Sequence, residues 1–253
     1  MVFKNFISLI SQDFNNQKLK SLKIIYILSL IIPGLLITGP FLSDLAVSVI
    51  GLIFIIFHFK QSINKIFKSN ITKIFLILLI PIIISSVFSE DSRSLKALFV
   101  IRFFLYFFSI ILIFTFFKNY SKIFFYFLSF FILLILFDML FQYFIGSNIL
   151  GFQPKIRGEN YYAYTSFFGD EKIAGSYIVR LLPLYIFLYF KHTNKNIISM
   201  FILFFILSIS FFVIFLSGQR AAFFYAFLLI ILTLAYLIYN SKKHFKYVLF
   251  LLI

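Results

Sequence analysis

The chain has 253 residues, of which 62% are hydrophobic and only 12% are charged, with a mean hydropathy of +1.06. Soluble globular proteins carry about 25% charged and about 45–50% apolar residues, so this composition excludes an ordinary soluble domain. The formal charge of +15 does not indicate a nucleic-acid partner, because the basic residues lie in short clusters between apolar runs and not on one soluble face. Cysteine is absent, which excludes thiolate metal sites, disulfides and cysteine nucleophiles.

The first 23 residues precede the first apolar run and form a segment of their own. They lack the apolar core and the small-residue cleavage site of a signal peptide. Their apolar residues recur at helical spacing: Phe3, Phe6, Ile7, Ile10 and Phe14. The segment is interpreted either as an amphipathic helix lying on the membrane or as a short disordered lead-in to a membrane domain at residues 24–253.

The rest of the chain divides into apolar runs separated by short polar segments. A helix needs about 20 mostly apolar residues to cross the roughly 30 Å hydrocarbon core of a bilayer. The predicted spans are 24–39, 41–59, 74–89, 97–117, 122–145, 173–190, 197–216 and 221–239. A ninth run begins near Phe245 and reaches only to Ile253, which is too short to cross. We therefore expect an all-α, polytopic transmembrane helical bundle with about eight complete spans and a truncated ninth.

Charged residues in the loops indicate how these spans are oriented. Fifteen of the 23 basic residues fall in the N-terminal segment and in alternate loops, where the only acidic residue is Asp13. The opposite side holds the other eight basic residues together with seven acidic ones. Because basic loops are retained in the cytoplasm, we predict a cytoplasmic N-terminus and an outer face of mixed charge.

Three ionisable residues fall inside predicted spans, namely Arg102, Asp138 and Arg180. At 1.5 Å per residue they lie roughly 7–12 Å below the outer surface. Charges at such a depth are costly and face a cavity, a partner or a substrate. Extension of each side chain to the interface, or an Arg–Asp pair between helices, is one interpretation. The shared depth of the two arginines favours a second, an anion site that opens outward.

The longest outer loop, residues 146–171, combines aromatic and charged residues. Its tyrosines suit sugar stacking and a membrane-interface belt equally well: Tyr161, Tyr162 and Tyr164. Asp170 and Glu171 end the loop just before the sixth span, where acidic residues also cap helices.

A short polar break, Ser217-Gly218-Gln219-Arg220, separates the seventh and eighth spans on the outer side. The free N–H groups of the helix that starts there, together with the Arg220 guanidinium, suit a phosphate group. The alternative is an ordinary polar turn between two helices.

The order of these residues resembles the O-antigen ligase and O-antigen polymerase family over roughly residues 74–240. The segments that carry the resemblance are Ser89-Glu90-Asp91-x2-Ser94-Leu95-Lys96, Ile101-Arg102-Phe103, Asp138-x3-Gln142-Tyr143-Phe144-x-Gly146, Arg157-Gly158, Phe168-Gly169-Asp170-Glu171-x2-Ala174-Gly175-Ser176-Tyr177 with Pro183, and Leu216-Ser217-Gly218-Gln219-Arg220. Each segment is short, and their order and their placement on the outer face make the combination specific.

The resemblance implies a multi-pass glycosyltransferase of the bacterial inner membrane with a GT-C-like fold. Such enzymes take an undecaprenyl-diphosphate-linked glycan on the periplasmic side and transfer it to lipid A–core or to another repeat unit. Carried over onto this chain, the resemblance makes Arg220 the first candidate for holding the diphosphate, followed by Arg180 and Arg102. The further candidates for substrate binding are Ser217, Asp170, Glu171 and Arg157. No metal or cofactor is implied.

One departure from the family concerns histidine. The family carries an important histidine in a large periplasmic loop beyond the matched region, whereas His58, His192 and His244 all map to the predicted cytoplasmic side. Together with the short ninth run, this leads us to expect an incomplete chain that is inactive alone and whose catalytic residues are unknown.

Two other classes of membrane protein stay open. A transporter or flippase of lipid-linked or anionic glycans would also use intramembrane arginines, although it would line its cavity with charge through the full depth of the bilayer. Here the inner halves of the spans carry no charge, and the eight runs show no internal repeat. A membrane scaffold with paired arginines is the third possibility.

Overall fold

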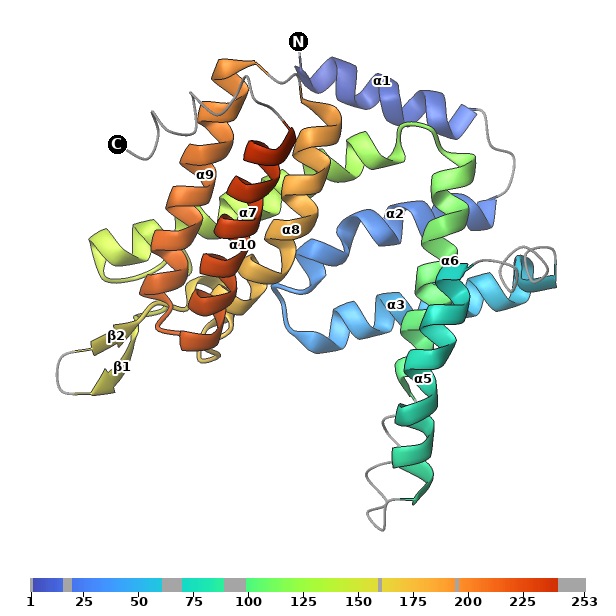
Figure 1. Ribbon diagram of the computed structural model, residues 1–253, viewed down its shortest axis with the longest axis horizontal. Helices are drawn as coiled ribbons and strands as arrows, with labels where there is room; N and C mark the ends of the chain where they lie inside the picture. Colours follow the sequence, from blue (N-terminus) through green and yellow to red (C-terminus); the bar gives the residue numbers. More distant parts are fainter. Residues whose placement is uncertain are drawn as a thin grey trace. The chain divides into compact units, whose positions relative to one another are not determined.

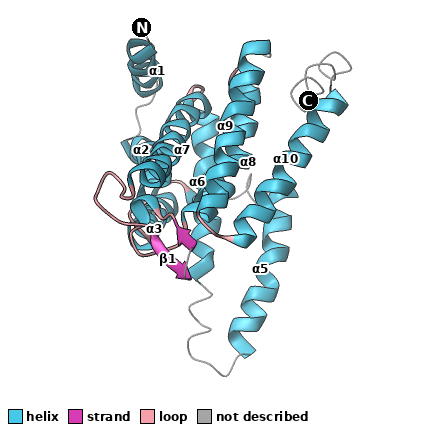
Figure 2. Ribbon diagram, turned by 90° about the vertical axis from the view of Figure 1, so that its left-hand side faces the viewer, coloured by secondary structure: helices cyan, strands magenta, loops and turns pink. Residues whose placement is uncertain are grey.

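The computed structural model describes residues 2–15, 20–60, 70–88, 99–158, 161–193 and 196–240. Most of these residues are helical, and the chain divides into two compact units, Met1–Ile123 and Phe124–Ile253 (Figure 1; Figure 2). We take the two units in turn.

The first unit contains the helices α1 (Val2–Asn15), α2 (Lys20–Leu35), α3 (Pro40–Phe57), α5 (Asn70–Phe88) and α6 (Ile101–Phe116). Helix α3 packs against both α2 and α6, and α2 also packs against α6. The ring of Phe54 on α3 stacks on that of Phe108 on α6, with their centroids 6.3 Å apart. Gly51 lets these two helices approach closely, because a Cβ there would lie 3.2 Å from the Cβ of Leu105.

Helix α1 forms over the residues whose spacing predicts a helix. Its C-terminal end packs on aromatic residues of the first unit, with the Phe14 ring centroid 5.3 Å from that of Tyr26 and 6.4 Å from that of Phe117. Asp13 is buried and accepts hydrogen bonds from the Tyr26 hydroxyl at 3.4 Å and from the backbone and side-chain N–H groups of Asn119 at 3.4 and 3.3 Å. These contacts hold the end of α1 against the unit.

The second unit begins within α7 (Tyr120–Ile145) and continues through an outer loop to α8 (Ala174–His192), α9 (Ile197–Leu216) and α10 (Arg220–Asn240). The last three helices pack against one another in pairs (Figure 1). Phe125 on α7 stacks on Tyr185 of α8 at 5.7 Å.

The loop between α7 and α8, predicted to be outer, adds a short hairpin to the mostly helical fold. Within it, β1 (Lys155–Gly158) and β2 (Tyr161–Ala163) pair antiparallel, with Lys155 opposite Ala163 and an irregular register at Arg157 (Figure 2). A 3-10 turn, η2 (Ser166–Phe168), follows. Strands this short show too little alternation of apolar and polar residues to be recognised from sequence, because their stability comes from the pairing itself.

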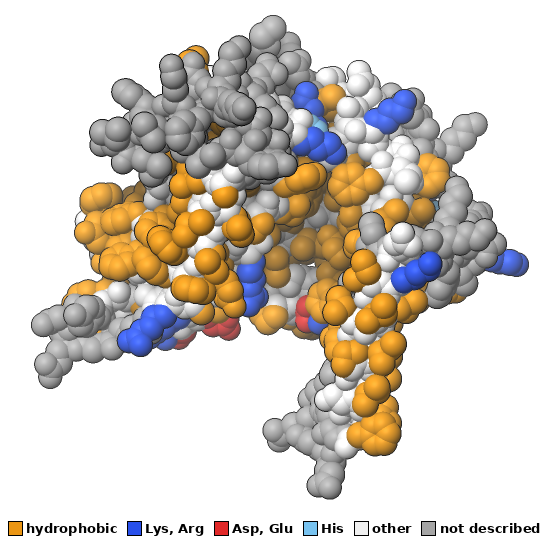
Figure 3. Space-filling model, viewed as in Figure 1, with side chains coloured by type: hydrophobic (Ala, Val, Ile, Leu, Met, Phe, Trp, Pro, Cys, Tyr) orange, Lys and Arg blue, Asp and Glu red, His pale blue; other side chains and the backbone are white. Residues whose placement is uncertain are grey.

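Each of the eight predicted apolar runs coincides with a helix, from α2 and α3 through α5 to α10. Three of them, α3, α7 and α9, are long and apolar enough to cross a membrane. Large apolar side chains lie exposed along the helices and cover much of the visible surface (Figure 3). Lipid is the solvent that suits such a surface. Residues 89–98, His244 and the ninth run lie outside the described residues.

Candidate functional site

A network of buried polar side chains joins the outer loop to the end of α7. Asp138 and Gln142 on α7 are 0% exposed. Asp138 accepts a 2.6 Å hydrogen bond from the Ser166 hydroxyl and a 3.0 Å bond from the backbone N–H of Ile149. The Gln142 amide oxygen accepts from the backbone N–H groups of Thr165 and Ser166, both at 3.0 Å, and its amide nitrogen donates to the Phe152 carbonyl at 3.0 Å.

Asn148 closes the first part of the loop in the same way. Its amide nitrogen donates to the Ser166 carbonyl at 2.8 Å, and its amide oxygen accepts from the backbone N–H of Phe152 at 2.7 Å. Ser166 lies in the left-handed region, with φ 53°, which is unfavourable for a residue that carries a Cβ. The bonds to Asp138, Gln142 and Asn148 offset that cost. We call Asp138, Gln142, Asn148 and Ser166 the loop network.

The turn between α9 and α10 packs directly on the start of α8. The Gln219 amide oxygen accepts from the backbone N–H of Ser176 at 2.6 Å and from its hydroxyl at 2.7 Å. Ser217 is buried and donates to the Ile214 carbonyl at 2.6 Å. A Cβ at Gly175 would come within 2.3 Å of the Ser217 hydroxyl oxygen, so glycine is required for this close approach. Residues 217–219 thus form the turn between α9 and α10, and Gln219 connects this turn to the start of α8.

Asp170 and Glu171 do not cap α8. The helix is preceded by Ile173, which provides no side-chain cap, and no acidic residue lies in the first turn. Asp170 is 93% exposed and its carboxylate lies 2.8 Å from the Lys155 ammonium on β1. Gln219 satisfies an N–H group in the first turn of α8 instead.

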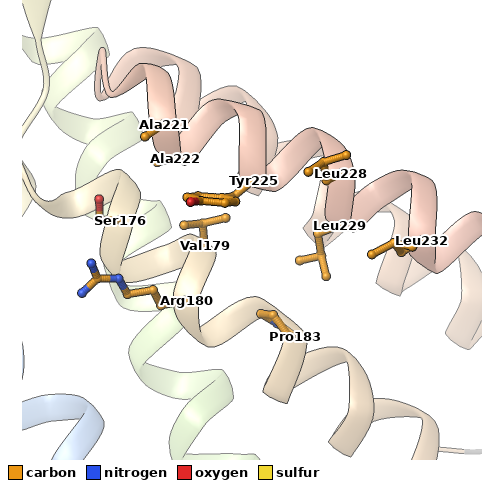
Figure 4. A pocket seen from close by; sticks show the side chains of 10 residues that line it. All are labelled: Ser176, Val179, Arg180, Pro183, Ala221, Ala222, Tyr225, Leu228, Leu229 and Leu232. Atoms are coloured by element: carbon orange, nitrogen blue, oxygen red, sulfur yellow. The ribbon is translucent and has the colours of Figure 1, made fainter. Parts of the chain in front are cut away.

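An open groove of about 420 Å³ runs between α8 and α10. It is lined by Ser176, Val179, Arg180, Pro183, Ala221, Ala222, Tyr225, Leu228, Leu229 and Leu232. We call it the α8–α10 groove. Ser176 and Ala221 lie toward one end of it, and Pro183 and Leu232 lie toward the other (Figure 4). The Arg180 guanidinium points toward the Ser176 end (Figure 4).

Arg180 and Arg220 both expose their side chains, and Arg220 immediately precedes Ala221 of the groove. Within the part of the chain that the structure describes, neither of them forms an ion pair. Arg102 differs, because on α6 its guanidinium lies 2.5 Å from the Asp44 carboxylate on α3. That contact is the interhelical Arg–Asp pair that one interpretation of the sequence predicts.

The remaining sequence candidates lie in the outer loop or near helix ends. The backbone of Arg157 lies at the irregular position of β1, and its side chain falls outside what the structure describes. Tyr164 meets Tyr143 of α7 edge-on at 5.5 Å, and burial together with the hydroxyls of Tyr143 and Tyr162 raises the pKa of Tyr164. His58 hydrogen-bonds to Ser21 at 3.0 Å.

Sequence reasoning missed the loop-binding role of Asn148 and Ser166 and the apolar groove residues of α10. Neither set carries a local signal, since the roles depend on contacts between distant segments. Among the described residues, no group of three or more His, Cys, Asp or Glu side chains is placed to hold a metal ion. No protein-family model matches the chain, and neither does any curated protein or solved structure.

Proposed function

We propose that the chain belongs to an integral inner-membrane glycan transferase. It would move an undecaprenyl-diphosphate-linked O-antigen or polysaccharide unit to lipid A–core, or to another repeat unit, on the periplasmic face. The proposal includes about eight transmembrane spans, a cytoplasmic N-terminus and a GT-C-like arrangement. It rests on the resemblance described above and on the geometry of the second unit.

The observation that carries the proposal is the α8–α10 groove. Its Pro, Val, Leu and Ala lining is suited to the hydrocarbon of a lipid, and one end is marked by Ser176 and Arg180. A lipid diphosphate has the same two-part chemistry, an apolar chain joined to a strongly anionic group. A guanidinium forms short, charge-assisted hydrogen bonds to phosphate oxygens, which makes arginine the suited residue at that end.

The unpaired state of the two arginines supports their assignment. Arg102 is already neutralised by Asp44, whereas Arg180 and Arg220 have no ion-pair partner among the described residues. Arg220 also starts α10, so its guanidinium and the free N–H groups of that helix end add to the same positive potential. We therefore rank Arg180 and Arg220 ahead of Arg102 as diphosphate ligands.

The proposed chemistry uses these arginines to stabilise the leaving group. An acceptor hydroxyl oxygen attacks the anomeric carbon of the donor sugar and loses its proton, while the bond from that carbon to the diphosphate oxygen breaks. Negative charge then develops on the departing diphosphate. Fixed guanidinium groups in a site partly shielded from water stabilise that charge more than water does. The base that accepts the proton is not assigned to any described residue.

Contacts within each unit support the proposed topology. Ser21 at the start of α2 bonds to His58 just after α3, and Asp13 of α1 bonds to Asn119, all on the predicted cytoplasmic side. Asp44 near the start of α3 pairs with Arg102 at the start of α6, both on the predicted outer side. In the second unit, Ser176 and Gln219 meet on the predicted outer side.

The test is transfer by Arg180→Ala and Arg220→Ala variants of the full-length protein. Purified protein in vesicles is given an undecaprenyl-diphosphate-linked glycan and lipid A–core, and released undecaprenyl diphosphate is measured. Loss of one charge-stabilising donor costs about 10²–10³-fold in rate, and we expect a decrease of that order for each variant.

Lys172→Ala is the matched control, because Lys172 is an exposed basic residue just after the outer loop and does not line the groove. It should retain transfer, and all three variants should reach the membrane in equal amounts. Normal transfer by both arginine variants would contradict the proposed site. Movement of the glycan across the vesicle membrane without any release of undecaprenyl diphosphate would indicate a transporter instead.

A further inference from the structure

The segment that follows α7 exposes a run of large apolar side chains in a stretch that the sequence assigns to an aqueous outer loop. Ile149, Leu150 and Phe152 are all exposed, with Leu150 at 63%. Soluble loops carry polar residues at such positions, since exposed apolar groups there gain nothing from water. The segment thus has the surface of a membrane helix without being one.

The chain does not rise away from α7 but turns back along it. Asp138 lies about two helical turns, or about 10 Å, before the end of α7 at Ile145. Its carboxylate nevertheless bonds to the backbone N–H of Ile149 and to the hydroxyl of Ser166. Residues 146–149 therefore descend to the level of a residue that belongs to a candidate membrane span.

Several backbone groups of this segment are satisfied internally. The N–H of Gly146 donates to the Gln142 carbonyl, and the N–H of Ile149 donates to the Asp138 carboxylate. The N–H of Gly151 donates to the Asn148 carbonyl, and that of Phe152 donates to the Asn148 side chain. The Phe152 carbonyl accepts from the Gln142 side chain and from the Asn148 N–H. Non-helical backbone is tolerated at membrane depth where it is buried against protein, and these bonds hold the backbone of the segment against α7.

Exposed apolar side chains occur on α7 as well as on the segment that follows it. One stripe of α7 is exposed at helical spacing: Tyr126, Phe130, Leu133, Phe137 and Phe144. Phe144, at 77% exposed, and Ile145 bring exposed apolar side chains to the helix end, and Ile149 and Leu150 are the next exposed apolar residues along the chain. Exposed apolar side chains on α7 and on the segment that follows it favour an apolar environment for both.

We propose that residues 146–152 re-enter the outer leaflet, with Ile149, Leu150 and Phe152 in contact with lipid hydrocarbon. Asp138, Gln142 and Asn148 then serve as internal hydrogen-bond partners that replace water for a non-helical backbone. The proposal concerns the membrane boundary of the outer loop and does not depend on the glycan-transfer function.

Single tryptophans test this placement. The chain contains no Trp, so Leu150→Trp introduces the only one, and its fluorescence is measured in vesicles containing phosphatidylcholine brominated near the carbonyl end of the acyl chain. Phe137→Trp, on the exposed stripe of α7, is the lipid-facing reference, and Lys172→Trp, at an exposed position just after the outer loop, is the aqueous reference. Ile149→Trp is measured as a second position, in case Leu150→Trp disturbs the fold.

We expect bromolipid to quench the tryptophan fluorescence of Leu150→Trp and Ile149→Trp nearly as strongly as that of Phe137→Trp, and more strongly than that of Lys172→Trp. Aqueous iodide should quench the fluorescence of Leu150→Trp and Ile149→Trp only weakly. Quenching closer to that of Lys172→Trp would overturn the proposal, whether water or a second protein copy covers the segment. Each variant is compared only if its circular dichroism spectrum shows the same helix content as the unsubstituted protein.

Discussion

The charged residues that the sequence predicts near the outer membrane face differ in what compensates their charge. Arg102 is neutralised by Asp44, and Asp138 is engaged by the Ile149 N–H and the Ser166 hydroxyl. Arg180 instead lies exposed in an apolar groove. A charge at membrane depth is costly unless it is paired or bonded, which is why we propose Arg180 as a ligand for an anionic group. The sequence places all three residues at similar depth but shows none of their partners.

Gly175 provides the sharpest prediction at this scale. Gly175→Ala brings a methyl group within 2.3 Å of the Ser217 hydroxyl oxygen and 3.0 Å of the Gln219 amide oxygen. Because Ser217 is buried and bonded to the Ile214 carbonyl, it yields only by giving up that bond. We expect overpacking to cost about 1–3 kcal/mol, measured as a lower thermal unfolding temperature in detergent.

Gly51→Ala is the control, since it is also helical and its added Cβ would lie 3.2 Å from a single side chain, Leu105. It should cost less than Gly175→Ala, because its contact is less severe and the preference of alanine over glycine in a helix, about 1 kcal/mol, offsets part of the cost. Equal unfolding temperatures for the Gly175→Ala variant and the unsubstituted protein would show that the α9–α10 turn does not pack on α8 as described.

At the scale of the elements, helix ends are held by side chains from other elements. Gln219 satisfies the first turn of α8, although Asp170 and Glu171 stand closer in sequence. Asp13 connects the end of α1 to Asn119. Local capping rules therefore predict where these helices begin but not which residue stabilises them, because that residue is brought in by folding.

The stability of the contact between α1 and the rest of the first unit should depend on pH. Burial raises the pKa of Asp13 above 3.8, although hydrogen bonds from Asn119 and Tyr26 oppose this effect. When α1 is packed on the rest of the first unit, Asp13 therefore favours its protonated form. The resulting stabilisation of this contact is fully present below the pKa that Asp13 has when α1 is detached. It is lost as pH rises through the higher pKa that Asp13 has when α1 is packed. Hydrogen exchange in α1, corrected for intrinsic rates, should show more protection near about pH 4 than near about pH 8.

Asp13→Asn removes the ionisation while keeping an amide oxygen as acceptor for Asn119. Its α1 should stay protected at both pH values. Protection that increases with pH in the unsubstituted protein, or an unchanged pH dependence in the variant, would contradict this account of the contact.

At the scale of the whole molecule, the positions of the helices could be predicted from sequence almost completely. A helix exposed to lipid needs an uninterrupted apolar run, so each of the eight runs coincides with a helix. The outer loop could not be predicted, since the hairpin, the loop network and the return of residues 146–149 along α7 depend on pairs far apart in sequence. The groove combines residues of α8 and α10, and only its α8 residues Ser176, Arg180 and Pro183 carry a sequence signal.

The most direct test of the central claim is the affinity of the α8–α10 groove for a lipid diphosphate. Binding of undecaprenyl diphosphate and of neutral undecaprenol is measured on the purified full-length protein, on Arg180→Ala and on Leu229→Glu. Arg180→Ala should weaken binding of the diphosphate by about 10–100-fold, the equivalent of one charge-assisted hydrogen bond, and leave undecaprenol binding unchanged. Leu229→Glu should weaken binding of both lipids, because it places a charge in the apolar lining. Equal diphosphate affinity for Arg180→Ala and the unsubstituted protein would contradict the claim.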